Sequence, residues 1–362
     1  MAATMNKKLS SRKLSLLNDD PRRTAEAVQL VYVRDSQPGI SRIKAATGFR
    51  YTWKGKPLSA AQLDRIKKLV IPPAWSGVWI CNDPKGHLQA TGYDTKGRKQ
   101  YLYHPDWNTL RNMTKFAHLY EFGTALPVIR KKLNEDLKQT AFTASKVLAL
   151  IVSVMEQTSI RIGNASYEKL YGSYGLTTLR NRHVVFDDNQ VRFSFTGKKS
   201  VKQHITLTNK RLVRIMHQCH DIPGKELFQY YDDNNNRCSV DSGMVNDYIR
   251  GISGGHFTAK DFRTWAGSLH ALRAFSELEP PVHNNDAHRN IVQVLDQVAA
   301  ALGNTRSVCK KYYVHPLLPE LYAGKGFPDP ATWAELPGAD ELSGAEKALM
   351  HILKNTTIEL SA

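Results

Sequence analysis

The chain of 362 residues carries 50 lysines and arginines against 33 aspartates and glutamates, which gives a net charge of +17. This length is enough for two domains with a sizeable core. The positive charge favours binding to polyanions, and nucleic acid, a ribosome or a membrane surface would satisfy it equally well. No stretch approaches the roughly 18 apolar residues that span a membrane, so no membrane partner is expected.

The cysteines and the N-terminus indicate a reducing, cytoplasmic setting. The four cysteines lack the paired spacing of a disulfide framework; they are Cys81, Cys219, Cys238 and Cys309. His217 and His220 flank Cys219, but no second pair of ligands follows, so no metal site is expected. The N-terminal residues are basic and have no apolar core of a secretory signal. We therefore predict a flexible basic leader over residues 1–27.

Residues 28–108 are predicted to form a small β-rich N-terminal domain. Short segments rich in aromatic and β-branched residues indicate strands; they are residues 48–53, 78–81, 87–91 and 100–103. Turn sequences containing Gly and Asp separate these segments. One helix is expected from Ser59 to Leu69, with Ser59 as its N-cap.

Residues 109–362 are predicted to form a larger, mainly α-helical domain with a small β-sheet. Apolar residues recur at helical spacing in residues 116–137, 143–157, 210–220, 242–250, 259–274, 287–302 and 344–354. Short β segments are expected at residues 184–186, 191–195 and 204–207. The predicted fold class is therefore α+β.

Four segments of this larger domain carry the residues that point to a chemistry: Arg161–Asn164, Thr196–Lys199, Lys260–Trp265 and Leu302–Tyr313. A tyrosine oxygen can attack a phosphodiester, and guanidinium groups match the negative charge that gathers on the nonbridging oxygens. A lysine can protonate the oxygen that leaves. Such a set can break a phosphodiester without a metal ion.

Two other chemistries are disfavoured. The acidic residues are scattered, with no carboxylate cluster of the kind that two-metal nucleases use. Lys198 is not part of a nucleotide-binding P-loop, because Arg192 stands where that motif needs its first glycine and Lys199 where it needs serine or threonine. We therefore expect no metal and no small-molecule cofactor.

The order Arg161, Lys198, Arg263, Asn304 and Tyr313 resembles the catalytic residues of type IB DNA topoisomerases, specifically the compact poxvirus-like enzymes found in bacteria. The resemblance covers roughly residues 28–316. Each motif is short, but their order and the step from Asn304 to Tyr313 make the combined pattern specific. The resemblance implies a C-shaped clamp in which residues 28–108 bind DNA and residues 109–362 are catalytic.

The resemblance also implies a role for each residue. Arg161 would contact a nonbridging oxygen and assist the leaving group, and Lys198 would be the general acid toward the 5′ oxygen. Arg263 would clamp the phosphate, with Lys260 one turn earlier on the same helix face. Asn304, which stands where viral relatives carry histidine, would donate a hydrogen bond to a phosphate oxygen.

Tyr313 is the nucleophile that this resemblance implies, and Tyr312 is the alternative. An unbroken helix would place Asn304 and Tyr313 on opposite faces, so the two can converge only if the helix ends at Gly303. A free tyrosine has a pKa of roughly 10, and no dedicated base lies nearby in the sequence. Either cationic surroundings lower the pKa of this tyrosine when the phosphate is bound, or water takes the proton, and both routes stay open.

Further DNA contacts follow from the same resemblance. Gln100 would reach a base edge, Tyr101 and Tyr103 would contact phosphates, and Tyr167 matches another contact of the family. Tyr101 and Tyr103 lie on the same face of one predicted strand. The alternative is that these aromatic side chains fill the core of a small sheet.

The function implied by the resemblance is relaxation of supercoiled double-stranded DNA by a bacterial, cytoplasmic and nucleoid-associated monomer. One strand is cut through a 3′-phosphotyrosyl intermediate, the duplex rotates, and the strand is rejoined without ATP or metal. A tyrosine recombinase is the nearest alternative, although Lys260 holds the place where that family usually carries histidine. A non-catalytic DNA-packaging protein would explain the charge but not the ordered residues.

Overall fold

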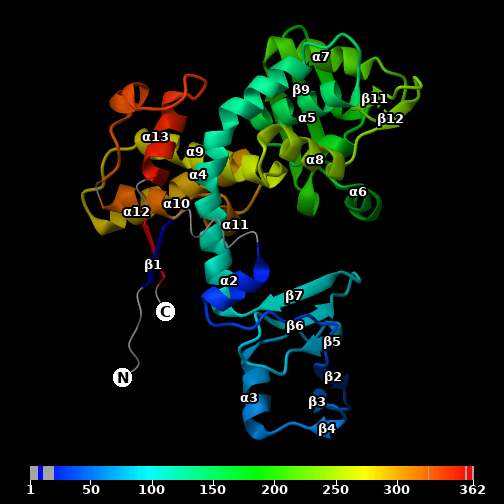
Figure 1. Cartoon of the computed structure of the whole chain (residues 1–362), viewed down its shortest axis with the longest axis vertical. Coiled ribbons are helices and arrows are strands. Elements are labelled where there is room, and N and C mark those ends of the chain that lie inside the picture. Colours follow the sequence, from blue (N-terminus) through cyan, green and yellow to red (C-terminus); the bar gives the residue numbers. More distant parts are fainter. Residues whose placement is uncertain (1–6, 11–19, 325, 355–356, 361–362) are drawn as a thin grey trace. The chain divides into compact units, whose positions relative to one another are not determined.

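The computed structural model describes residues 7–10, 20–324, 326–354 and 357–360. The chain divides into two compact units. One holds the described residues of Met1–His118 and Thr356–Ala362, and the other holds those of Leu119–Asn355. Helix α4 (Pro105–Asp136) begins in the first unit and ends in the second (Figure 1). The fold is α+β, as predicted, because antiparallel sheets and helices occupy separate stretches of the chain.

The first unit is built on an antiparallel sheet of six strands in the order β4-β3-β2-β5-β6-β7. The strands are β2 (Ile40–Lys44), β3 (Phe49–Trp53), β4 (Lys56–Pro57), β5 (Ser76–Ile80), β6 (Leu88–Tyr93) and β7 (Lys99–Tyr103). Helix α3 (Ala60–Lys68) packs on this sheet, where its Ile66 joins Ile40 and Ile80 in a small core. Ser59 caps α3 through reciprocal hydrogen bonds with Gln62, which confirms the predicted N-cap.

The predicted leader over residues 1–27 is wrong for two segments. Lys7–Ser10 forms strand β1, which pairs antiparallel with β13 (Thr357–Leu360). Pro21–Ala27 forms helix α2, in which Pro21 occupies the first turn and Ala25 is buried against a small aromatic and aliphatic cluster. Burial of Thr24 and Ala25 stabilises α2, although its composition alone indicated a leader. The remainder of residues 1–27 lies outside the described part.

The second unit surrounds helix α5 (Ala144–Thr158), which is buried on all sides. A three-stranded antiparallel sheet in the order β10-β9-β8 lies beside it. Its strands are β8 (Val184–Asp187), β9 (Gln190–Thr196) and β10 (Lys202–Leu207), and a hairpin is formed by β11 (Gln229–Tyr231) and β12 (Arg237–Ser239). These strands confirm the predicted β section and add the hairpin.

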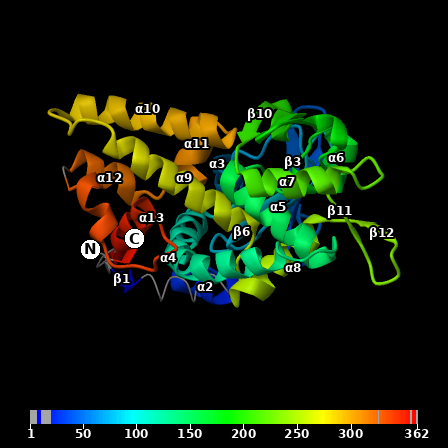
Figure 2. The ribbon, with the colours of Figure 1, turned by 90° about the horizontal axis from the view of Figure 1, so that it is seen from above.

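The other helices of this unit are α6 (Ala165–Tyr171), α7 (Lys210–His220), α8 (Ser242–Ser253), α9 (Ala259–Ser276), α10 (Asn284–Leu302), α11 (Arg306–Tyr312), α12 (Leu317–Ala323) and α13 (Gly344–Lys354). Helices α9 and α10 pack side by side, as Figures 1 and 2 show from two directions. Among the described helices, none is long and apolar enough to cross a membrane.

The structure departs from the sequence-based prediction mainly in short elements and helix starts. Helices α6, α11 and α12 were not predicted, because a helix of two turns shows too little apolar periodicity. Strand β2 was not predicted either. Helix α4 begins at Pro105 rather than at residue 116, since proline is well suited to the first turn of a helix. The boundary predicted between residues 108 and 109 therefore falls inside a continuous helix.

Candidate active site

A cavity of about 290 Å³ in the second unit gathers side chains from five separate segments of the chain. Its lining includes four of the five predicted catalytic residues, Arg161, Lys198, Arg263 and Tyr313. Two predicted DNA contacts, Lys260 and Tyr167, line it as well. Tertiary structure thus brings together side chains that lie as much as 152 residues apart in sequence, from Arg161 to Tyr313 (313 − 161).

Arg161 stands in the loop between α5 and α6. The loop packs against residues 175–177, where the Leu176 and Thr177 amides donate to the carbonyls of Arg161 and Ile162 at 2.9 and 2.7 Å. A Cβ atom on Gly175 would come within 2.5 Å of the Arg161 carbonyl oxygen, so only glycine permits this approach. Gly175 therefore shapes the loop that presents Arg161, and the sequence analysis did not identify it.

The Arg161 side chain contacts Asn304, another of the predicted catalytic residues, and the neighbouring Gly303. Its Nη2 donates to the Gly303 carbonyl at 3.2 Å and to Oδ1 of Asn304 at 2.5 Å. Burial, and then the nearby charge of Arg263, lowers the pKa of Arg161 to about 10. The guanidinium still carries its proton at neutral pH. Asn304 is not among the residues lining the cavity and joins the group only through Arg161.

Arg263 lies on α9 with only 5% of its surface exposed. Its Nη1 donates to the Ser159 carbonyl, and its Nη2 donates to the Leu302 carbonyl at 2.8 Å. Its buried Nε has no hydrogen-bond partner within the described residues. Burial lowers the pKa of Arg263, and the neighbouring Tyr313 opposes that shift. The guanidinium carbon lies 5.3 Å from the centre of the Tyr313 ring.

The electrostatics of this cavity favour an anion. The positive charge of Arg263 contributes to the lowered pKa of Arg161, so the two guanidinium groups lie close together. Neither forms an ion pair with a carboxylate in the part of the chain that the structure describes. Buried charges are normally paired. One buried and one partly buried guanidinium therefore lack a carboxylate partner among the described residues, an arrangement whose charge suits an anion such as a phosphate group.

Lys198 extends from the tight turn between β9 and β10. The turn is closed by a hydrogen bond of 2.8 Å from the Gly197 amide to the Val201 carbonyl, and Lys199 and Ser200 both have positive φ angles. The Lys198 side chain is exposed and makes no hydrogen bond or ion pair to another described residue. It is therefore available to a bound ligand.

Tyr313 follows α11 directly. Helix α10 ends at Leu302 with Gly303 in the left-handed conformation at φ +57°, and α11 begins at Arg306. The predicted break at Gly303 is therefore confirmed. Tyr313 is half-buried in the cavity lining, whereas Tyr312 is 37% exposed and is absent from that lining. The geometry thus favours Tyr313 over Tyr312 as the nucleophile.

Comparison with known proteins agrees with this arrangement. A model of the eukaryotic DNA topoisomerase I catalytic core matches residues 104–317. The chain is also 31% identical over 293 residues to DNA topoisomerase 1B of Acanthamoeba polyphaga mimivirus, a match that covers 78% of this chain and 87% of the relative. The chain belongs to the type IB DNA topoisomerase family. It is therefore an isomerase that acts on DNA.

More distant relatives and a second model extend the comparison. DNA topoisomerase 1B of vaccinia virus (strain Copenhagen) is 23% identical over 240 residues, covering 66% of this chain and 73% of the viral protein. A model of the bacterial DNA topoisomerase IB N-terminal domain matches residues 48–94. The predicted bacterial origin of this type IB topoisomerase stays a prediction, because the mimivirus and vaccinia relatives are viral.

The predicted DNA contacts of the first unit lie on β7, at the edge of its sheet. Tyr101 is 49% exposed and stacks on Tyr103, with ring centres 6.1 Å apart. Tyr103 also packs against Trp107 and His87, so part of its ring serves the aromatic core. Gln100 donates to Oδ2 of Asp94 at 2.9 Å. Their roles toward DNA stay predictions.

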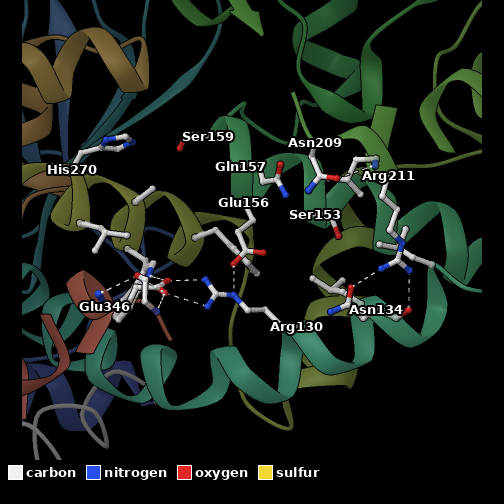
Figure 3. A pocket seen from close by; sticks show the side chains of 18 of the residues that line it. Arg130, Asn134, Ser153, Glu156, Gln157, Ser159, Asn209, Arg211, His270 and Glu346 are labelled. Atoms are coloured by element: carbon white, nitrogen blue, oxygen red, sulfur yellow. Dashed lines mark hydrogen bonds and ion pairs between the residues drawn. The ribbon is translucent and has the colours of Figure 1, made fainter. Parts of the chain in front are cut away.

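A partly buried ion-pair network borders a second pocket of the same unit (Figure 3). Arg130 on α4 donates through Nε to Glu156 on α5 at 2.8 Å and through Nη2 to Glu346 on α13 at 2.6 Å. The three side chains border a second cavity of about 670 Å³, whose lining also includes Ser159, the residue that accepts from Arg263. The network thus joins three helices that support the site.

We expect Glu346→Gln to lower the free energy of unfolding by about 3 kcal/mol at pH 7, because it leaves Arg130 with weaker compensation. Burial alone would raise the pKa of Glu346, but hydrogen bonds from Arg130 and Ser343 hold it below its ordinary value of 4.5. A depressed folded pKa contributes stability above pH 4.5 that is lost on further acidification. The difference in the free energy of unfolding between wild type and Glu346→Gln, measured by denaturant unfolding, should therefore become smaller below pH 4.5.

Glu156→Gln is the matched control, because burial raises the pKa of Glu156 and disfavours its ionised form. This change leaves the Arg130–Glu346 pair in place and should cost less than about 1 kcal/mol at pH 7. Equal losses for the two variants would show that Glu346 is not the main partner of Arg130.

Proposed function

We propose that this type IB topoisomerase relaxes supercoiled double-stranded DNA by cutting and rejoining one strand through Tyr313, without ATP or metal. The observation that carries the proposal is the cavity lined by a buried and a partly buried arginine, a tyrosine and an exposed lysine, in which neither arginine forms an ion pair with a carboxylate of the described residues. Each group matches a requirement of phosphodiester exchange. Membership of the family supplies the DNA substrate and the isomerase activity.

The proposed reaction is a reversible exchange at one phosphorus atom. The Tyr313 oxygen bonds to phosphorus as the bond to the 5′ oxygen breaks, which leaves a 3′-phosphotyrosyl link and a free 5′ hydroxyl. Lys198 donates the proton that the leaving oxygen needs. The phenolic proton passes to solvent, and the positive charge of the surrounding cations favours its loss. The link conserves the bond energy, so the 5′ hydroxyl can rejoin the strand after rotation.

The arginines would stabilise the charge that develops on the phosphate. Arg263 and Arg161 would each donate to nonbridging oxygens, and Arg161 would assist departure of the 5′ oxygen. Asn304 would contribute a hydrogen bond to the phosphate, although in the free protein its amide oxygen accepts from Arg161. Lys260 and Tyr167, which line the same cavity, would contact the adjacent backbone.

The first unit would supply the remaining DNA contacts. We propose that Gln100 reads a base edge and that Tyr101 and Tyr103 contact phosphates, with the two units acting as a C-shaped clamp on the duplex. The exposed ring of Tyr101 on an edge strand supports the phosphate contact. Action as a monomer and a nucleoid-associated, cytoplasmic location belong to the same proposal.

Relaxation of negatively supercoiled plasmid in EDTA and without ATP tests this function. We expect full relaxation, at a rate that added Mg²⁺ changes far less than removal of Tyr313 does, because the cavity's own cations stabilise the phosphate charge. A strict requirement for ATP or a divalent cation would refute the proposal. Strand exchange between two DNA sites would favour a recombinase, and binding without any covalent adduct would favour a packaging protein.

A further inference from the structure

Ser268 on α9 makes two hydrogen bonds to the main chain of the segment that begins at Tyr313. Its Oγ donates to the Tyr313 carbonyl at 3.1 Å and accepts from the His315 amide at 3.1 Å. Ser268 is completely buried. A serine inside a helix commonly bonds to the carbonyl of the preceding turn, as Thr264 does with Lys260 on the same helix. The Ser268 hydroxyl instead serves the segment that carries the nucleophile.

Gly267 allows this segment to approach α9. A Cβ atom at this position would lie 2.7 Å from the Tyr313 carbonyl oxygen and 2.9 Å from the Tyr313 Cβ. Both distances are shorter than van der Waals contact, and the first involves main chain that cannot rotate away. Any side chain at position 267 would therefore displace the backbone of Tyr313.

The opposite edge of the same segment is held by α11. The Cys309 carbonyl accepts from the Tyr313 amide at 2.9 Å and from the Val314 amide at 3.0 Å. The backbone of residues 313–315 is thus fixed from both sides. Arg263, one turn before Gly267 on α9, lies beside the Tyr313 ring. One helix therefore carries both the phosphate-binding arginine and the attachment point of the nucleophile.

We propose that Gly267 and Ser268 are positioning residues that hold the main chain of Tyr313 in register with Arg263 during cleavage and religation. This inference rests on the proposed role of Tyr313 as the nucleophile. Cleavage and religation pass through the same transition state in opposite directions. A misplaced nucleophile therefore slows both steps by a similar factor, since small errors in the alignment of reacting atoms cost large factors in rate.

The test compares Ser268→Ala and Gly267→Ala with the wild-type protein under single-turnover conditions. Adduct trapped with detergent at excess enzyme gives the cleavage rate constant, and closure of preformed adduct after a jump to high salt gives the religation rate constant. We expect Ser268→Ala to slow both steps about tenfold and Gly267→Ala to slow both about a hundredfold. The fraction of DNA held as adduct at equilibrium should change less than twofold.

DNA affinity separates positioning from a general structural defect. It is measured in a Tyr313→Phe background, with and without Ser268→Ala, and should differ less than twofold. Ser276→Ala is the matched control, because this hydroxyl on the same helix donates to the Arg273 carbonyl within its own turn and has no other hydrogen-bond partner among the described residues. Ser268→Cys, which keeps the size but donates a weaker hydrogen bond, should give intermediate rates if the alanine variant folds poorly.

Two results would overturn the inference. Rates within twofold of wild type for Ser268→Ala would show that the hydroxyl does not position Tyr313. A loss of DNA affinity that matches the loss of rate would assign Ser268 a structural role instead. Tyr313→Phe is assayed in parallel to distinguish the positioning role of Ser268 from the role of Tyr313 as the nucleophile. If Tyr313→Phe forms the adduct, Tyr313 is not the nucleophile, whatever the result for Ser268→Ala.

Discussion

Tyr313→Phe is expected to abolish both the covalent DNA adduct and plasmid relaxation, with a rate loss of at least about 10⁴-fold. The change removes only the phenolic oxygen and keeps the ring that lies beside Arg263. The backbone of residue 313 should keep its hydrogen bonds to Ser268 and Cys309. Folding and DNA affinity should therefore persist while chemistry is lost. Detergent-trapped adduct on a denaturing gel measures the first effect directly.

Tyr312→Phe is the control for this prediction. Tyr312 is the neighbouring tyrosine, is more than a third exposed, and is absent from the lining of the active-site cavity. Its variant should retain adduct formation and relaxation within a few-fold of wild type. An active Tyr313→Phe beside an inactive Tyr312→Phe would move the nucleophile to residue 312 and overturn the geometric assignment.

Lys198→Ala is expected to slow strand cleavage by about 10²- to 10⁴-fold, the usual contribution of a general acid. The side chain is exposed on a tight turn and has no described partner, so its removal should not disturb the fold. Single-turnover adduct formation on plasmid DNA provides the measurement. Lys199→Ala is the neighbouring control, because Lys199 does not line the cavity and should leave the rate within a few-fold of wild type.

A modified substrate separates proton donation by Lys198 from simple charge stabilisation. If sulfur replaces the bridging 5′ oxygen at the cleaved bond, the leaving thiolate needs little or no protonation, since thiols are far more acidic than alcohols. Lys198→Ala should then cleave at nearly the wild-type rate. Arg263→Ala should stay slow on both substrates, because its proposed contribution is to the phosphate oxygens. Equal defects of Lys198→Ala on both substrates would exclude the general-acid role.

Much of the local structure could be predicted from the sequence, because its determinants lie within a few residues of one another. The Ser59–Gln62 capping box marks the start of α3. Gly303 marks the end of α10, and this break places Asn304 between α10 and α11, the helix that leads to Tyr313. The alternation of apolar residues likewise predicted the strands on both sides of Lys198.

The departures from the prediction concern short elements. Helices α6 and α11 are two turns long, and an apolar period cannot be recognised over so few residues. Helix α2 was predicted as part of a leader because its composition is basic, whereas burial of Ala25 beside Leu30 and Trp107 holds it in place. The fold class did not depend on these short elements.

The sequence by itself determined the fold class, the position of the helix break before Tyr313 and the order of the five residues that resemble a catalytic set. Only the tertiary structure decided that Arg161 contacts Gly303 across 142 residues, that Ser268 holds the Tyr313 main chain, and that Arg130 lies between two glutamates. Caps and turns depend on neighbouring residues, whereas these contacts depend on how distant helices pack. No local pattern records that packing.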